Sequence, residues 1–158
     1  MQKISPFLWF DHQAEEAANF YVSVFENSRI VNVSRYGEGA PAPAGSAMSV
    51  SFVLEGLEFQ ALNAGPQYTF TEAISFLVDV GTQDEIDRLW DALTSDGGEP
   101  GQCGWLKDRF GLSWQIVPPI LGQLLSDPDP AKAGRVMQAM LSMNKLDIAG
   151  LQAAHDSE

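Results

Sequence analysis

An internal repeat constrains this chain more than any other feature of its sequence. A shift of 69 residues places Phe7 on Phe76, and it also superposes the spaced apolar residues of two predicted helices. A shift of 55 residues places residues 56–62 on residues 111–117. Any two amphipathic strand–helix units share some apolar matches, so coincidence is the alternative explanation. The paired Gly-Leu-x-aromatic-Gln segments favour duplication of a β-α-β-β-β module.

Hydrophobic periodicity predicts the elements of both modules and of a tail. Spacings of three and four residues indicate helices, whereas short apolar or alternating runs indicate strands. Residues 1–118 are expected to form one domain, with module one over 1–66 and module two over 70–118. Residues 119–158 are expected to add a helical extension to the same domain. The predicted strands are 4–10, 29–36, 48–54, 57–62, 73–80, 103–108 and 112–117, and the predicted helices are 13–25, 83–94, 121–125, 131–143 and 146–154, with Asp11 in the N-terminal cap region of the first helix.

Composition excludes several classes of function. The chain has 9 Lys and Arg residues against 21 Asp and Glu residues, a formal charge of −12. This balance disfavours nucleic acid and anionic membranes as partners, because both need clustered basic side chains. No apolar run approaches the roughly 20 residues that span a bilayer. The N-terminus lacks the layout of a signal peptide and Cys103 is the single cysteine, so we expect a cytoplasmic protein.

Five segments together resemble a known superfamily. They are ISPFLWFD at 4–11, AEEAANFYVSVF at 14–25, FQALN at 59–63, WLKDRFGLSWQIVP at 105–118 and LSDPDP at 125–130. The chain resembles the vicinal oxygen chelate superfamily of glyoxalases, bleomycin-resistance proteins and extradiol dioxygenases. Within it, the sequence is similar to the PhnB-like group, named 3-demethylubiquinone-9 3-methyltransferase domain proteins.

The resemblance implies a fold and a test of chemistry. The implied fold is α+β, with two βαβββ modules forming a curved mixed sheet around a concave cavity, usually in a homodimer. Metal-dependent members carry ligands at positions that correspond here to Ile4, Ala73, Gln60 and Gln115. Two of these are hydrocarbons and two are neutral amides, which are poor ligands for a divalent ion. We therefore expect no metal and no cofactor, although another register could supply one or two ligands.

Strand alternation predicts the residues that could bind a ligand. Leu8, Phe10, Gln60, Ser75, Leu77 and Gln115 are expected on the sheet face opposite the helices. Trp9, Trp90 and Trp114 are expected in the core, Lys107 to Arg109 in a turn, and His12 in solvent or at a cap. An alternative is that Gln60 and Gln115 bond to each other or to backbone within a packed core. The predicted substrate-binding residues are Phe10, Gln60, Ser75, Trp105 and Gln115.

Three classes of function follow. The first is a metal-free protein that binds a small organic molecule in its cavity, whether or not it is an enzyme. The second is a lyase, isomerase or dioxygenase with an unrecognised metal arrangement. The third is an interaction module that docks a partner through its acidic surface and through Met137, Met140 and Met143 in the tail. Methyl transfer is disfavoured, because the glycines fall in loops and form no cofactor-binding turn after a strand.

Overall fold

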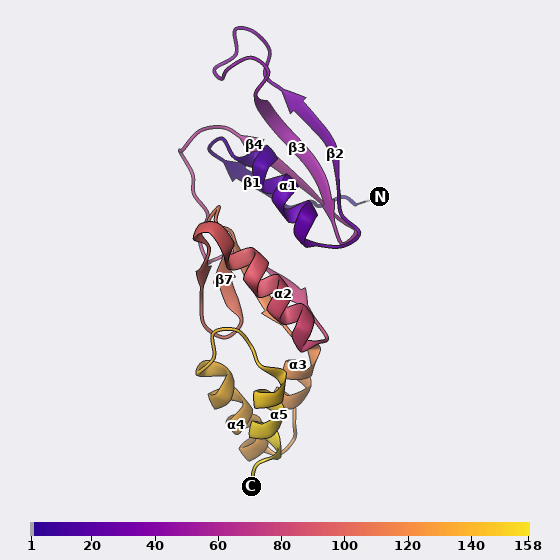
Figure 1. The fold of residues 1–158 in the computed structure, drawn as a ribbon, viewed down its shortest axis with the longest axis vertical. Helices are drawn as coiled ribbons and strands as arrows, with labels where there is room; N and C mark the ends of the chain where they lie inside the picture. Colours follow the sequence, from indigo (N-terminus) through magenta and orange to yellow (C-terminus); the bar gives the residue numbers. More distant parts are fainter. Residues whose placement is uncertain (1) are drawn as a thin grey trace. The chain divides into compact units, whose positions relative to one another are not determined.

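Each repeat forms a four-stranded mixed sheet with one helix against it (Figure 1). The computed structural model describes residues 2–158 as two compact units, divided after Phe70. The predicted α+β fold of duplicated modules is confirmed. No helix in residues 2–158 is long and apolar enough to cross a membrane.

In the first unit, the sheet order is β1-β4-β3-β2, with β1 parallel to β4 and the other pairs antiparallel. In the second unit, the order is β5-β8-β7-β6, again with one parallel pair, β5 with β8. The second sheet contains one strand, β6, that periodicity did not predict. The elements are β1 (Phe7–Phe10), α1 (Ala14–Val24), β2 (Arg29–Arg35), β3 (Ala47–Leu54), β4 (Leu57–Asn63), β5 (Ser75–Asp79), α2 (Gln83–Thr94), a 3-10 turn (Ser95–Gly97), β6 (Glu99–Pro100), β7 (Trp105–Lys107) and β8 (Ser113–Val117).

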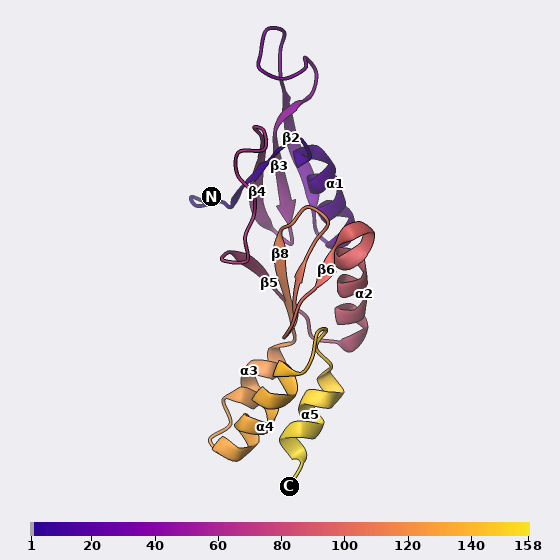
Figure 2. The same ribbon diagram turned by 90° about the vertical axis from the view of Figure 1, so that its left-hand side faces the viewer.

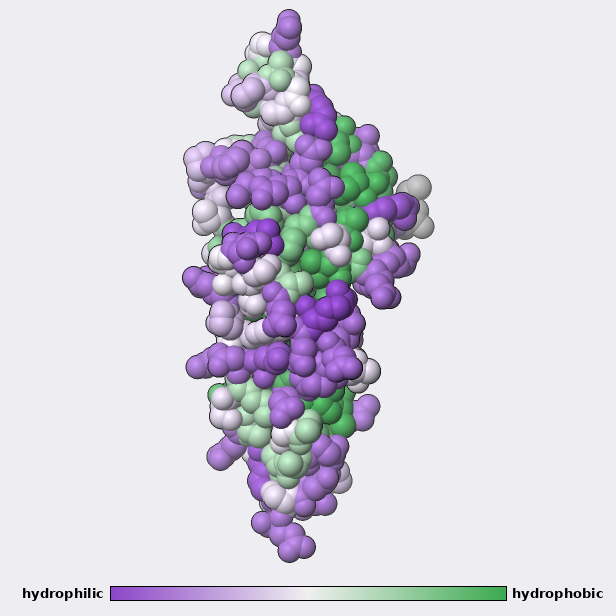
Figure 3. Space-filling model, viewed as in Figure 1, coloured by the Kyte–Doolittle hydropathy of each residue, from purple (hydrophilic) through white to green (hydrophobic). Residues whose placement is uncertain are grey.

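Each helix packs its apolar stripe on one face of its own sheet (Figure 2). The Tyr21 ring of α1 lies 6.4 Å from the Phe52 ring of β3, centroid to centroid. In α2 the buried residues are Ile86, Leu89, Trp90 and Leu93, at helical spacing. The outward side of α2 is hydrophilic (Figure 3), with Asp84, Arg88 and Asp91 exposed.

The caps of these two helices differ. Asp11 was expected near the cap of α1, but the residue at that position is Gln13, whose side chain makes no capping bond. Instead, Oδ1 of Asn63 accepts a 2.8 Å hydrogen bond from the Ala14 N–H. In α2, Thr82 Oγ1 accepts from the Glu85 N–H, the usual arrangement at a helix N-terminus.

The first strands of the two modules are related by a different sequence shift from the helices, which corrects the predicted shift of 69 for these strands. Leu8 pairs with Ala61 in the first sheet, and Val78 pairs with Ile116 in the second. The last strands therefore match at the predicted 55, but the first strands match at 70 rather than 69. The helices keep 69, because Ala17 and Ile86 are equivalent buried positions. The connection from strand to helix is thus one residue shorter in the second unit.

A shift of one residue moves every side chain of a strand to the other face. Leu8, which pairs with Ala61, is 6 % exposed, and Phe10, two residues along the same side of β1, is 4 % exposed; both lie on the side of α1. The expectation that Leu8 and Phe10 lie opposite the helix is therefore wrong. Trp9, expected in the core, lies on the open side, where its Nε1 donates to the Gly65 carbonyl at 2.9 Å. Trp90 and Trp114 are buried as predicted.

The predicted tail helices are α3 (Pro119–Leu125), α4 (Pro130–Leu141) and α5 (Ile148–Asp156), which form part of the second unit. They pack on one another around a cluster of Leu121, Leu124, Val136, Leu146 and Leu151. Met140 and Met143 pack against this cluster, whereas Met137 is 41 % exposed. The segment before α5 is bonded to the strand region, since the N–H groups of Cys103 and Gly104 donate to the carbonyls of Met143 and Asn144.

Candidate functional site

The face of the second sheet opposite α2 brings together three of the five predicted binding residues. Leu77, Gln115 and Trp105 lie side by side in one row across β5, β8 and β7. Ser75, Ser113 and Lys107 form the next row. Facing side chains alternate along each strand, so both rows belong to the same face.

The polar groups of this face are neutral near its centre. Nε2 of Gln115 donates a 2.9 Å hydrogen bond to Oγ of Ser75. Leu77, beside Gln115, is 54 % exposed, and Trp105 is half-buried on the other side. Gln115 therefore bonds to a side chain of its own face, and apolar surface flanks the pair. Apolar walls with a few oriented polar groups are typical of small-molecule sites.

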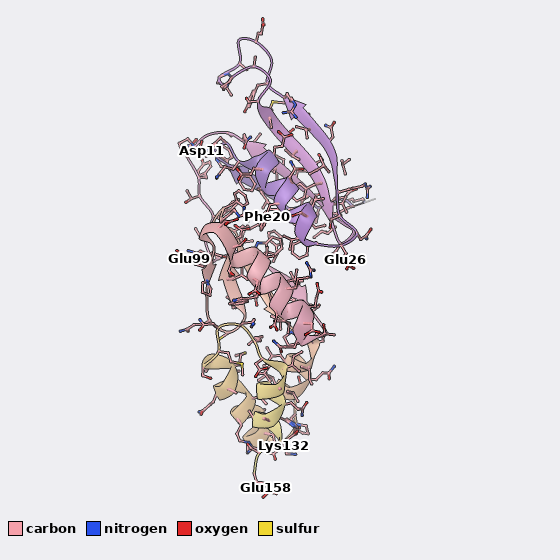
Figure 4. The ribbon with its side chains drawn as sticks, in the orientation of Figure 1. Asp11, Phe20, Glu26, Glu99, Lys132 and Glu158 are labelled. Carbon is pink, nitrogen blue, oxygen red and sulfur yellow. The ribbon has the colours of Figure 1, made fainter. Side chains whose placement is uncertain are left out.

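A small cavity of about 230 Å³ lies at one edge of this face, lined by Lys107, Trp105, Glu72 and Glu99 among others. Nζ of Lys107 forms an ion pair with Glu72. This contact, with the nearby charge of Glu99, raises the pKa of Lys107, and it lowers the pKa of Glu72. Glu99, labelled in Figure 4, comes from β6. The ammonium is therefore held protonated between two carboxylates.

The two other predicted residues lie in the first unit and do not share a face. Gln60 is exposed and lies on the open side, paired with Phe7 on β1 and Ser51 on β3. Phe10 lies on the α1 side, where its ring meets that of Phe70 edge-on at 5.2 Å. Because the shift between the first strands is one residue longer than predicted, Phe10 and Gln60 lie on opposite faces of the sheet. Phe7, not Phe10, is the aromatic neighbour of Gln60.

A second hollow, of about 930 Å³, opens in the first unit beside the start of α1. Arg35 in its wall forms an ion pair with Glu15 at 2.8 Å and a hydrogen bond to the Gly45 carbonyl. The Tyr36 hydroxyl donates to the Asn63 carbonyl at 2.6 Å. His12, in the same wall, has a side chain that is 78 % exposed, in keeping with a solvent position. The side chains of Arg35 and Tyr36, which could have bound a ligand in this hollow, already bond to other groups of the protein.

The residues at the superfamily's ligand positions do not suit a metal ion. Ile4 lies before β1 and is 87 % exposed, and with the corrected offset its counterpart is Ile74 rather than Ala73. Both are hydrocarbons, and Gln60 and Gln115 offer neutral amides, which are poor ligands for a divalent ion. Within residues 2–158, no group of three or more His, Cys, Asp or Glu side chains is arranged to hold a metal.

Sequence reasoning missed the polar row beside Gln115. Lys107 was assigned to a turn, but it ends β7 and faces the site, while Ser113 was not considered. The signal was present, because Lys107 and Ser113 each lie two residues from a predicted binding residue, Trp105 and Gln115. Alternation along a strand places such pairs on one face. The pairing of Glu72 with Lys107, by contrast, joins residues 35 positions apart and had no local signal.

A family model described as 3-demethylubiquinone-9 3-methyltransferase matches residues 2–117. The chain belongs to this family. The match ends at the last strand, so α3, α4 and α5 lie beyond it. The predicted membership of the PhnB-like group and the vicinal oxygen chelate superfamily is confirmed. No curated protein matches the chain.

Solved structures agree with the family assignment. A putative 3-demethylubiquinone-9 3-methyltransferase, PhnB protein, from Bacillus cereus is 38% identical with a TM-score of 0.69, covering 74% of this chain and 99% of that one. The protein PA1353 from Pseudomonas aeruginosa is 22% identical, with a TM-score of 0.62 and coverage of 75% and 98%. The fosfomycin resistance protein FosX from Mesorhizobium loti is 12% identical, with a TM-score of 0.53 and coverage of 73% and 91%. PA1353 and FosX show a shared fold alone.

Proposed function

We propose that this family member binds a small organic molecule on the open face of its second sheet, without the metal that the superfamily usually employs. The observation that carries the proposal is the Gln115–Ser75 hydrogen bond, set between exposed Leu77 and half-buried Trp105. An amide that is already oriented binds a ligand without losing further rotational freedom. Leu77 and Trp105 supply apolar contact area, and the Gln115 amide orients the ligand through a hydrogen bond.

The donor set supports the metal-free part of the proposal. The residues at the superfamily's ligand positions are hydrocarbons or amides, whereas divalent ions favour imidazole, carboxylate or thiolate. We do not propose methyl transfer. Neither sheet has the parallel, doubly wound strand order of a common cofactor-binding methyltransferase, since each contains one parallel pair.

We also propose that the protein works as a cytoplasmic homodimer, as family membership implies. Large apolar side chains on both units are exposed, including Phe7 at 59 % and Ile74 at 70 %. A partner copy would shield such surface from water. Sedimentation velocity tests this part, because a monomer at micromolar concentration contradicts it.

The binding proposal is tested by screening small neutral organic compounds against the full chain with amide and indole NMR. We expect hits to shift the Trp105 indole and the Gln115 side-chain signals. Gln115→Ala should weaken these hits by about tenfold, the value of one directed hydrogen bond. Gln60→Ala, the matched control on the first sheet, should leave them unchanged. Hits that bind only elsewhere contradict the proposal.

Metal analysis of protein purified without chelator tests the remaining part. We expect no stoichiometric zinc, manganese, nickel or iron. Stoichiometric metal, with turnover that Gln115→Ala abolishes, would instead support a metal-dependent lyase, isomerase or dioxygenase.

A further inference from the structure

The side chain of Ser113 is buried without a hydrogen-bond partner. Ser113 is 1 % exposed, and its Oγ makes no hydrogen bond to any of residues 2–158. A buried hydroxyl that has lost water and gained no partner costs free energy, so folded proteins rarely leave one unpaired. The feature therefore needs an explanation from its surroundings.

Those surroundings are the small cavity at the edge of the proposed binding face. Ser113 lines this cavity of about 230 Å³ together with Trp105, Lys107 and Glu72. In the strand register, its direct neighbours are Ser75 on β5 and Lys107 on β7. Ser113 thus lines a cavity, one row from Gln115, with its unpaired hydroxyl buried beneath the cavity surface.

The charges in the cavity select the kind of ligand. Lys107 contributes one positive charge, and Glu72 and Glu99 contribute two negative charges. A ligand with a full negative charge would meet net repulsion, and Lys107 is already engaged by Glu72. A cationic ligand would compete with Lys107 for the same carboxylates. A neutral ligand avoids both costs.

Catalysis by a Ser113–Lys107 pair does not fit this arrangement. A lysine acts as a base towards a serine only when it is neutral. Glu72 and Glu99 raise the pKa of Lys107 and keep it protonated. Lys107 is therefore not the base that would activate Ser113 as a nucleophile.

We infer that Ser113 donates a hydrogen bond to a carbonyl or similar acceptor of a small, neutral, planar molecule that lies against Trp105. This inference rests on the proposed function and names the ligand class of the same site. The cavity, of about 230 Å³, is smaller than the roughly 300–1,000 Å³ of drug-sized sites, so it accommodates a single small group. A planar group is favoured because it can pack on the Trp105 indole in the cavity lining. The Ser113 hydroxyl gains its missing partner only when that group is bound.

The experiment compares three probes of one size, benzamide, benzoate and benzylamine, by NMR titration of the full chain. Benzamide should bind most tightly of the three and shift the signals of Ser113, Lys107 and the Trp105 indole. Ser113→Ala should weaken benzamide binding by about tenfold. Ser51→Ala, on the open side of the first sheet, is the matched control and should have no effect. The free Ser113→Ala protein should melt no lower than wild type, because the substitution removes an unpaired hydroxyl.

Three results would overturn the inference. If benzamide binds Ser113→Ala as tightly as wild type, Ser113 is not the recognition group, although the proposed function stands. If benzoate or benzylamine binds more tightly than benzamide at this face, the ligand class is wrong. If none of the probes, and none of the screened compounds, shifts the Trp105 or Gln115 signals, both the inference and the proposed function fail.

Discussion

The indole Nε1 of Trp114 donates a 2.9 Å hydrogen bond to Oδ2 of Asp108, a carboxylate that is only 3 % exposed. The other carboxylate oxygen accepts from the N–H groups of Phe110 and Leu112, at 2.8 and 3.1 Å. Asp108 thus binds the β7–β8 turn to the core beneath the candidate site. The sequence predicted Asp108 as a turn residue, but not this bond to Trp114.

We expect Asp108→Asn to destabilise the protein. One of the three N–H donors around Asp108 would then face the amide NH₂ group, because Asn has a single acceptor oxygen. The expected loss is about 2–3 kcal/mol in the free energy of unfolding, the cost of an unsatisfied buried group. Urea denaturation measures it. Asp79→Asn, at the exposed end of β5, is the control and should change stability by less than about 0.5 kcal/mol.

The corrected strand offset is tested by a pair of substitutions in β1. Phe10→Ala removes a ring that is 4 % exposed and should cost about 3–5 kcal/mol. Phe7→Ala removes one that is 59 % exposed and should cost less than about 1 kcal/mol. Thermal and urea unfolding of the two variants measure the two losses in the free energy of unfolding. The opposite ranking would mean that Phe7, not Phe10, faces α1.

Gln83 connects the tail to the start of α2. Its Nε2 donates to the Leu146 carbonyl at 3.1 Å, and its Oε1 accepts from the Ile148 N–H at 2.8 Å. Gln83→Ala should therefore speed hydrogen exchange of the Ile148 amide by about tenfold or more. Gln152→Ala is the control, since the Gln152 amide bonds only to Asp156 within the last turn of α5. Unchanged exchange in Gln83→Ala would show that the Gln83 hydrogen bonds do not hold the start of α5 in place.

His155 makes the stability of the tail depend on pH. Its Nε2 lies 2.7 Å from Asp127 and its Nδ1 lies 3.0 Å from Asp156. Hydrogen bonds to Asp156 and Asp127 raise the pKa of His155 above its ordinary 6.5. The folded state therefore favours the protonated ring. This stabilisation is complete below the unfolded pKa and disappears as the pH rises through the higher folded pKa. The pKa of Asp127 is lowered chiefly by the hydrogen bond from the Asp129 N–H and by His155, and the pKa of Asp156 is lowered chiefly by His155. Lys132 of α4, labelled in Figure 4, adds a smaller contribution in the same direction.

The measurement is the melting temperature of wild type and His155→Gln between about pH 5.5 and pH 8.5, the range in which histidine titrates. Wild type should lose stability across this range, and His155→Gln should lose less. His12→Gln replaces the other histidine, which is 78 % exposed, and should keep the wild-type slope. Equal slopes in all three proteins would contradict the assigned role of His155.

Much of the fold could be predicted because its signals are local. The helical stripes of α1 and α2, and the hairpin around Asp108, depend on residues a few positions apart. The strand β6 could not be found in this way, because its two residues, Glu99 and Pro100, carry no alternating pattern. Its existence depends on pairing with β7.

The candidate site was predicted in part. Ser75 and Gln115 were placed on the right face because alternation in β5 and β8 was assigned in the right phase, and Trp105 of the final hairpin lies beside them. Phe10 was placed wrongly because the apolar run before Asp11 has no polar residue to set its phase. A buried and an exposed aromatic look alike in such a run.

The sequence by itself determined the duplicated α+β fold, the family and the lack of metal-binding residues at the superfamily's positions, because each depends on residue type and local spacing. Only the tertiary structure decided which side of each strand faces its helix, since register is set by pairing between distant strands. The same pairing brought Glu72 to Lys107, and it left Ser113 buried without a partner.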